Sequence, residues 1–216
     1  MGCSMKTLLL LAAAMLSMVP IAQAAPAAAD LPRLTFSKSF PGSVPAYFAI
    51  TIAPDGSATY NESEDPDNSE DLRLEPSAAR QAFELADRLD HFQHPLESGL
   101  KIANMGLKTL RWEQGAEHSE SKYNYSTIED AKALADIFER IGDSMRMILE
   151  LRRALKHDRL GVNDAVLRMQ AAWENRRLLL TDDILPLLDQ VAMNDAYIHM
   201  ARERAARMAD AIRASR

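Results

Sequence analysis

The spacing of apolar residues changes once along the chain, near Ser126. From Leu34 onward, apolar and polar residues alternate, which predicts strands with one buried face. After Ser126 the apolar residues recur at steps of three and four, which predicts amphipathic helices. This switch predicts an α+β fold. We expect a mainly antiparallel sheet of about five strands with a packed helix over residues 34–125, followed by an all-helical array over residues 126–216.

Two hairpins are expected in the first region. Strands over 34–40, 47–52 and 57–62 precede an acidic segment, Glu62 to Asp71, which we interpret as a loop; a helix is expected over 77–92. The turn Ala53-Pro54-Asp55-Gly56 suits a hairpin because proline presets φ and glycine accepts the left-handed conformation. Segments 107–113 and 116–125 predict a second hairpin whose polar return strand lies at a sheet edge. The predicted core residues of the strands are Leu34, Phe36, Phe40, Phe48, Ile50, Ile52, Ala58, Tyr60, Leu110 and Trp112.

Four helices are expected after Ser126. The stretch Ser126-Thr127-Ile128-Glu129 fits a capping box, and the helix that it begins should run to about Lys156. The next helix is expected to begin at Gly161. Thr181 and Asn194 are suitable N-caps for the last two helices.

The first 24 residues have the pattern of a secretory signal peptide. Lys6 supplies a positive charge, an apolar stretch covers residues 7–22, and Ala22-Gln23-Ala24 fits a cleavage site. The apolar stretch is shorter than the roughly 20 residues of a membrane span. We therefore expect a periplasmic or secreted protein, cleaved near Ala24, with a flexible leader over residues 25–33 and no membrane span after cleavage.

Composition excludes several function classes for the expected mature chain. The only cysteine, Cys3, lies before the cleavage site, so the mature chain has no thiolate nucleophile and no Cys-ligated metal. Residues 25–126 hold 16 acidic and 9 basic residues, and residues 127–216 hold 15 of each. Without a basic excess, nucleic-acid binding is disfavoured.

The acidic segment offers the one candidate metal site, with Asp65, Asp67 and Asp71 as possible calcium ligands. An EF-hand loop that begins at Asp65 would need glycine at its sixth position and glutamate at its twelfth, where this chain has Glu70 and Pro76. We therefore favour a solvated connector over a calcium site.

Histidines and hydrolase motifs give no stronger candidate. His91 and His94 lie at the expected end of the first helix, where the helix dipole favours histidine, and they are interpreted as capping residues rather than zinc ligands. Neither a G-x-S-x-G nor an H-E-x-x-H motif occurs, and there is no glycine-rich phosphate loop. No catalytic residue, cofactor or metal is therefore assigned.

The stretch from Phe40 to Glu62 resembles the opening of a family of small bacterial exported domains of unknown function. The matching residues are Pro45, Tyr47, Ile50, Ile52, Asp55 and Gly56, with the helix over 77–92 following in the same order. The resemblance covers about residues 34–125 and implies an exported α+β domain with no established activity. Val44 replaces a cysteine of that family, so no disulfide is implied here.

Together these features predict a non-catalytic, exported binding or interaction protein with a protein partner in the bacterial cell envelope. The helices after Ser126 are the expected contact surface. The alternative is an exported hydrolase whose catalytic residues are dispersed along the sequence, because a triad can assemble from distant positions.

Overall fold

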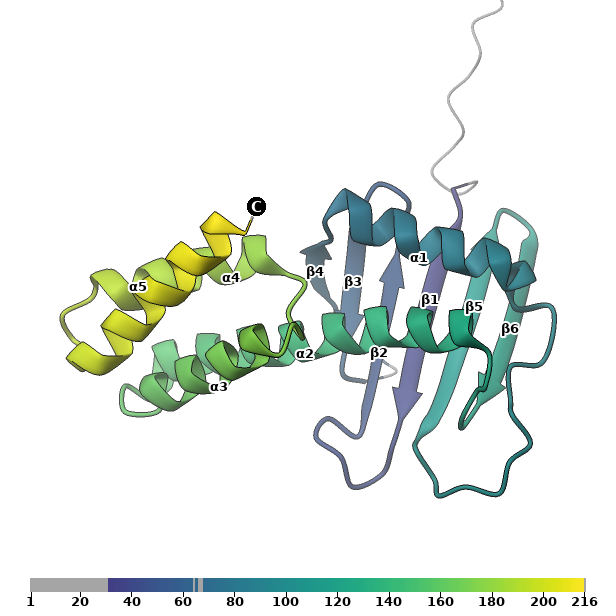
Figure 1. The fold of residues 1–216 in the computed structure, drawn as a ribbon, viewed down its shortest axis with the longest axis horizontal. Coiled ribbons are helices and arrows are strands. Elements are labelled where there is room, and N and C mark those ends of the chain that lie inside the picture. Colours follow the sequence, from purple (N-terminus) through teal and green to yellow (C-terminus); the bar gives the residue numbers. More distant parts are fainter. Residues whose placement is uncertain (1–30, 64, 66–67, 216) are drawn as a thin grey trace, which may run out of the picture.

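The computed structural model describes residues 31–63, 65 and 68–215, and it confirms the α+β fold with a C-terminal helical array (Figure 1). The first region contains β1 (Arg33–Ser39), β2 (Tyr47–Ile52), β3 (Ser57–Asn61), β4 (Glu70–Arg73), α1 (Pro76–Arg88), the short turn η3 (Asp90–Phe92), β5 (Leu107–Gln114) and β6 (Glu117–Tyr123). The second contains α2 (Glu129–His157), α3 (Val162–Glu174), α4 (Thr181–Met193) and α5 (His199–Ala214).

The sheet is antiparallel throughout, with the strand order β4-β3-β2-β1-β5-β6. On β1, Leu34 lies opposite Ile52 and Trp112, and Phe36 lies opposite Ile50 and Leu110. All six side chains are buried. Helices α1 and α2 cover this face, as the ring contacts of Trp112 with α1 and of Phe36 with α2 show (Figure 1). The predicted alternation and the edge position of the polar strand β6 are therefore confirmed.

The first hairpin turn has the predicted backbone chemistry. The Gly56 amide donates to the Ala53 carbonyl at 3.0 Å, and the Asp55 carboxylate accepts from the Ser57 amide at 3.0 Å. Gly56 has a φ of +84°, and its carbonyl accepts from the Leu74 amide at 2.8 Å. The turn therefore also fixes the residue that follows strand β4.

Two predicted boundaries are wrong. The acidic loop was expected to reach Asp71, but Glu70 and Asp71 belong to β4, because Leu72 is buried against the sheet and brings its neighbours into pairing with β3. The helix expected over 77–92 ends at Arg88. Residues Asp90, His91 and Phe92 then have φ values of 49°, 48° and 65°, a left-handed turn that buries the Phe92 ring.

Helix α2 belongs to both regions. At 1.5 Å per residue its 29 residues extend about 43 Å. Its first half packs on the sheet, where Phe138 stacks on Phe36 with ring centroids 5.1 Å apart. Its second half packs against α3 and α4, and α5 covers α3 and α4 (Figure 1). The two regions therefore share one hydrophobic core.

The predicted helix caps differ in detail from the structure. The Ser126 hydroxyl accepts from the Ile128 amide at 3.2 Å, and α2 begins only at Glu129, so the capping box does not form. Thr181 is the first residue of α4 rather than its cap, and α5 begins at His199, four residues after Asp195. In both places the preceding chain is held by other contacts. Leu180 is buried, and the Asn194 side chain accepts from the Ala196 amide at 2.9 Å.

Among the described residues, no helix combines the length and the apolar character that a membrane crossing requires.

Candidate functional site

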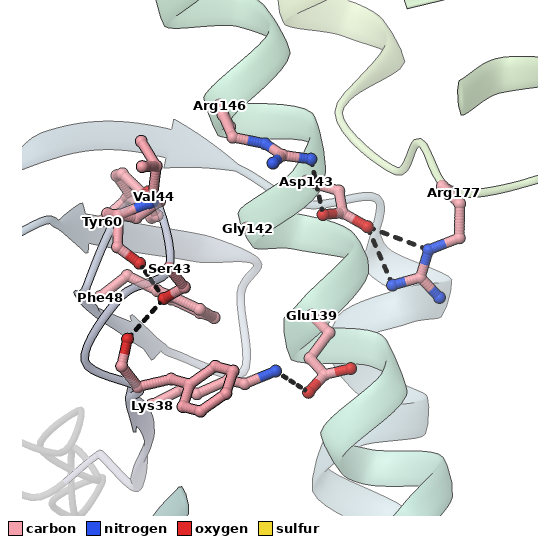
Figure 2. A pocket seen from close by; sticks show the side chains of 12 residues that line it. Lys38, Ser43, Val44, Phe48, Tyr60, Glu139, Gly142, Asp143, Arg146 and Arg177 are labelled. Atoms are coloured by element: carbon pink, nitrogen blue, oxygen red, sulfur yellow. Dashed lines mark hydrogen bonds and ion pairs between the residues drawn. The ribbon is translucent and has the colours of Figure 1, made fainter. Parts of the chain in front are cut away.

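Three adjoining depressions follow one side of α2, and together we call them the α2 groove. The first, of about 330 Å³, lies between the β1–β2 loop and α2 and is lined by Lys38, Val44, Phe48, Tyr60, Glu139 and Arg177 among others (Figure 2). The second, of about 550 Å³, shares Val44, Pro45 and Arg146 with the first and extends to Arg153. The third, of about 530 Å³, shares Glu62 and Leu149 with the second.

The floor of the first depression is aromatic. The Phe48 ring lies 5.9 Å from Phe36 and 6.2 Å from Tyr60, measured between centroids. On α2, Gly142 faces Phe48, and a Cβ at this position would lie 3.1 Å from the Phe48 ring. Because glycine costs an α-helix about 1 kcal/mol relative to alanine, its presence here is explained by this close packing.

The β1–β2 loop forms the opposite wall. The Ser43 hydroxyl lies 2.7 Å from the Phe40 carbonyl and 2.6 Å from the Pro45 carbonyl, and the Phe40 amide donates to the Ala46 carbonyl. These bonds close the loop on itself and leave the Val44 side chain 85% exposed. The loop therefore presents an apolar tip at the rim of the groove (Figure 2).

Ion pairs join the walls of the groove. Lys38 on β1 binds Glu139 on α2 with Nζ 2.8 Å from Oε1. Arg177, in the segment between α3 and α4, binds Asp143 at 2.9 Å (Figure 2). The same guanidinium group binds Asp136 at 2.6 Å. Burial lowers the pKa of the Arg177 guanidinium, but the hydrogen bonds that it donates to both carboxylates outweigh burial and raise the pKa above its usual value. This arginine fixes the helical array against the part of α2 that covers the sheet.

Tyr60 contributes a hydroxyl at the junction of the first and third depressions. Its hydroxyl donates to Glu62 Oε1 at 3.0 Å. Burial, reinforced by the Glu62 carboxylate, raises the pKa of Tyr60 far above its usual value. The phenol therefore stays protonated and acts as a hydrogen-bond donor.

Two of the three calcium candidates lie in the described part of the chain, one in a loop and one on a strand. Asp65 lies in the β3–β4 loop, with Oδ2 3.4 Å from the Asn68 side-chain nitrogen, and Asp71 lies on β4. Asp67 lies outside the described residues. Over residues 31–63, 65 and 68–215, no three His, Cys, Asp or Glu side chains are grouped as a metal site would require.

None of the histidines lines the α2 groove. His91 Nε2 lies 2.9 Å from an Asp87 oxygen, and its ring stacks on Trp112 with the centroids 4.0 Å apart. His94 pairs with Asp90 at 3.2 Å, and His199 pairs with Glu203 at the same distance. Rather than capping α1 through its last carbonyls, the first two histidines bind nearby carboxylates around the left-handed turn.

Sequence reasoning missed the groove because its residues come from segments that are far apart in the sequence. The glycine inside the long helix was one signal that could have been noticed, since an interior glycine marks close packing. Arg146 and Arg153 are seven residues apart on α2, a second signal of a shared helical face. Neither signal specifies which strand or loop lies opposite.

Comparison with known proteins adds no relative: no protein-family model and no curated protein matches the chain.

Proposed function

We propose that this is an exported, non-catalytic binding protein that holds an extended peptide segment of a cell-envelope partner in the α2 groove. The observation that carries the proposal is the length of the groove. Its lining on α2 runs from Glu139 to Arg153, and fourteen residues of helix span about 21 Å. An extended chain of about six residues has that length, at about 3.3 Å per residue.

The lining supports recognition of a peptide. The lining combines aromatic and apolar side chains from the sheet and the β1–β2 loop with charged side chains from α2, so both apolar and polar groups of a ligand would find partners. The walls are connected by ion pairs, which supports a groove that is formed before a ligand binds. The proposed contact surface thus lies on α2, the first of the helices after Ser126 that the sequence favoured as a group.

The chemistry of the lining favours binding over hydrolysis. Ser43, the one serine in the lining of the first depression, is bonded to the carbonyls of its own loop, and no histidine lies beside it in the groove. Lys38 is held by Glu139. Neither residue is placed as an activated nucleophile beside a base.

Export is proposed on the sequence of residues 1–24 alone. We expect the protein recovered from a bacterial envelope or culture medium to begin at Ala25, as determined by N-terminal sequencing. Recovery of the uncleaved chain from the cytoplasm would contradict export.

The binding proposal is tested by selection of a randomised hexapeptide library on immobilised mature protein. Enriched peptides are then measured by fluorescence anisotropy against Val44→Asp and Leu160→Asp variants. Both residues are 85% exposed, so neither change should affect folding, but only Val44 lines the groove. We expect weaker binding to Val44→Asp alone. Failure to enrich any peptide, or equal loss in both variants, would contradict the proposal, and turnover of generic ester, peptide or glycan substrates would favour the hydrolase alternative.

A further inference from the structure

We propose that the segment bound in the α2 groove is acidic, and that Arg146 and Arg153 bind two of its carboxylates. This inference rests on the proposed function and assigns the chemical class of its ligand. It follows from the contacts of the charged groups that line the groove: the carboxylates have partners within the protein, whereas two guanidinium groups keep most of their donors free.

The carboxylates of the groove are already engaged within the protein. Glu139 accepts from Lys38, and Glu62 accepts from the Tyr60 hydroxyl. Asp143 accepts from Arg177, and Glu150 is bound by Arg168. The negative charges of Glu139, Asp143 and Glu150 are therefore already paired with a lysine or an arginine of the protein, and among these four carboxylates Glu62 alone is bonded to a neutral group.

Two guanidinium groups, in contrast, keep most of their donors free. Within the described residues, the one ion pair of Arg146 is with Asp143, at 3.4 Å, and that carboxylate is bound more closely by Arg177. Arg153 makes no hydrogen bond or ion pair with the described part of the chain, although its neighbour Arg152 pairs with Glu70. Each guanidinium group has five N–H donors in a planar arrangement that suits a carboxylate. The free donors of Arg146 and Arg153 therefore favour an anionic ligand.

The spacing of the two arginines defines the ligand further. They lie seven residues apart on α2, which is two turns or about 10 Å along the helix axis. In a peptide with the extended polyproline II conformation, which has three residues per turn, acidic residues three positions apart lie on the same face and are separated by about 9 Å. Val44, Pro45, Met147 and Leu149 line the same depression as the arginines, so apolar residues between the two acids would contact apolar surface. The expected pattern is acidic–apolar–apolar–acidic.

The test uses three fluorescein-labelled peptides, VDLVDL, VNLVNL and VKLVKL, in anisotropy titrations with the mature protein at low and high salt. We expect VDLVDL to bind more tightly than the other two, with an affinity that falls as salt rises. Arg146→Met and Arg153→Met should each weaken its binding by roughly threefold to tenfold, since exposed ion pairs contribute modestly. Arg80→Met is the matched control, because Arg80 is an exposed arginine on α1 outside the groove.

Equal binding of VDLVDL and VNLVNL would overturn the acidic assignment while leaving a peptide groove in place. Loss of affinity in Arg80→Met equal to that in the groove variants would do the same, because it would show a general charge effect. A failure of all three peptides to bind would also overturn the assignment. In that case the peptide proposal still depends on the separate library selection, so the two failures are distinguishable.

Discussion

The backbone of Gly142 lies against the ring of Phe48, so that a Cβ on the glycine would be 3.1 Å from the ring edge. This contact joins the centre of α2 to strand β2 and sets the width of the first depression. Both residues line the groove, so a change at either one alters its shape.

We expect Gly142→Ala to change binding more than stability. Alanine favours the helix by about 1 kcal/mol, which offsets part of the crowding. Phe48 is only partly buried and can shift by a few tenths of an ångström into the groove. The free energy of unfolding in urea should therefore stay within about 1 kcal/mol of the native value, while affinity for selected peptides falls several-fold. The double variant Gly142→Ala/Phe48→Leu should have no crowding at this contact. The single variant Phe48→Leu is its control, because it measures the loss of binding that comes only from the missing aromatic ring.

Gly56→Ala should destabilise the protein strongly. The residue has a φ of +84°, and a Cβ there would lie 2.7 Å from the Leu74 carbonyl oxygen, which belongs to the backbone and cannot move freely. We expect a loss of about 2–4 kcal/mol in urea unfolding. Gly99→Ala is the matched control, because Gly99 also has positive φ but has nothing within 4 Å, and it should cost about 1 kcal/mol. Equal losses would show that the close approach to Leu74 contributes nothing.

Tyr123→Phe should stabilise the protein. The side chain is 3% exposed, and its hydroxyl has no hydrogen-bond partner among the described residues. Burial, with a smaller effect of the Glu139 carboxylate, raises the pKa of the phenol far above its usual value. Removal of an unsatisfied buried hydroxyl should add about 1 kcal/mol to the free energy of unfolding.

Tyr60→Phe provides the comparison for this change. It removes a hydroxyl that donates to Glu62 from an equally buried ring, so it should lower the free energy of unfolding by about 1 kcal/mol. If both variants change stability in the same direction, hydrogen bonding of the phenol does not determine the outcome.

Asp183 should make stability depend on pH in the direction opposite to that of most carboxylates. Burial raises the pKa of Asp183 above its usual value, with a smaller opposing effect from Arg152. The folded state therefore binds its proton more tightly than the unfolded state, and the contribution of Asp183 to stability falls as pH rises from about 4 through the raised pKa. Asp183→Asn should raise the free energy of unfolding at pH 7 and have less effect at pH 4. Asp182→Asn, in the same turn but exposed, should show no such gain.

The strands were predictable because each has a simple alternation with one buried face. Leu34, Phe36, Ile50 and Ile52 are buried as expected, and the turn at Gly56 forms with the predicted left-handed glycine. Strand β4 was not predictable from composition, because its sequence EDLR resembles a solvated loop. Its place depends on one buried leucine and on the bond from Leu74 to Gly56.

The left-handed turn after α1 and the α2 groove were hidden for a related reason. Non-glycine residues avoid positive φ, so the sequence Asp90-His91-Phe92 gives no local signal for this conformation. It is held by distant contacts, including the stacking of His91 on Trp112. The groove likewise depends on which loop lies opposite which face of α2, and spacing within one helix does not supply that information.

The most direct test of the α2 groove is a ¹H–¹⁵N NMR titration of the labelled mature protein with a peptide selected from the hexapeptide library. We predict that the largest chemical-shift changes occur at the amides of Val44, Gly142 and Arg146, on both walls of the groove. Amides of Thr35 and Thr109, on the uncovered face of the sheet, should change little. If the largest changes occur on that face, or at Leu160 in the turn after α2, and the groove amides are unaffected, the α2 groove is not the binding site.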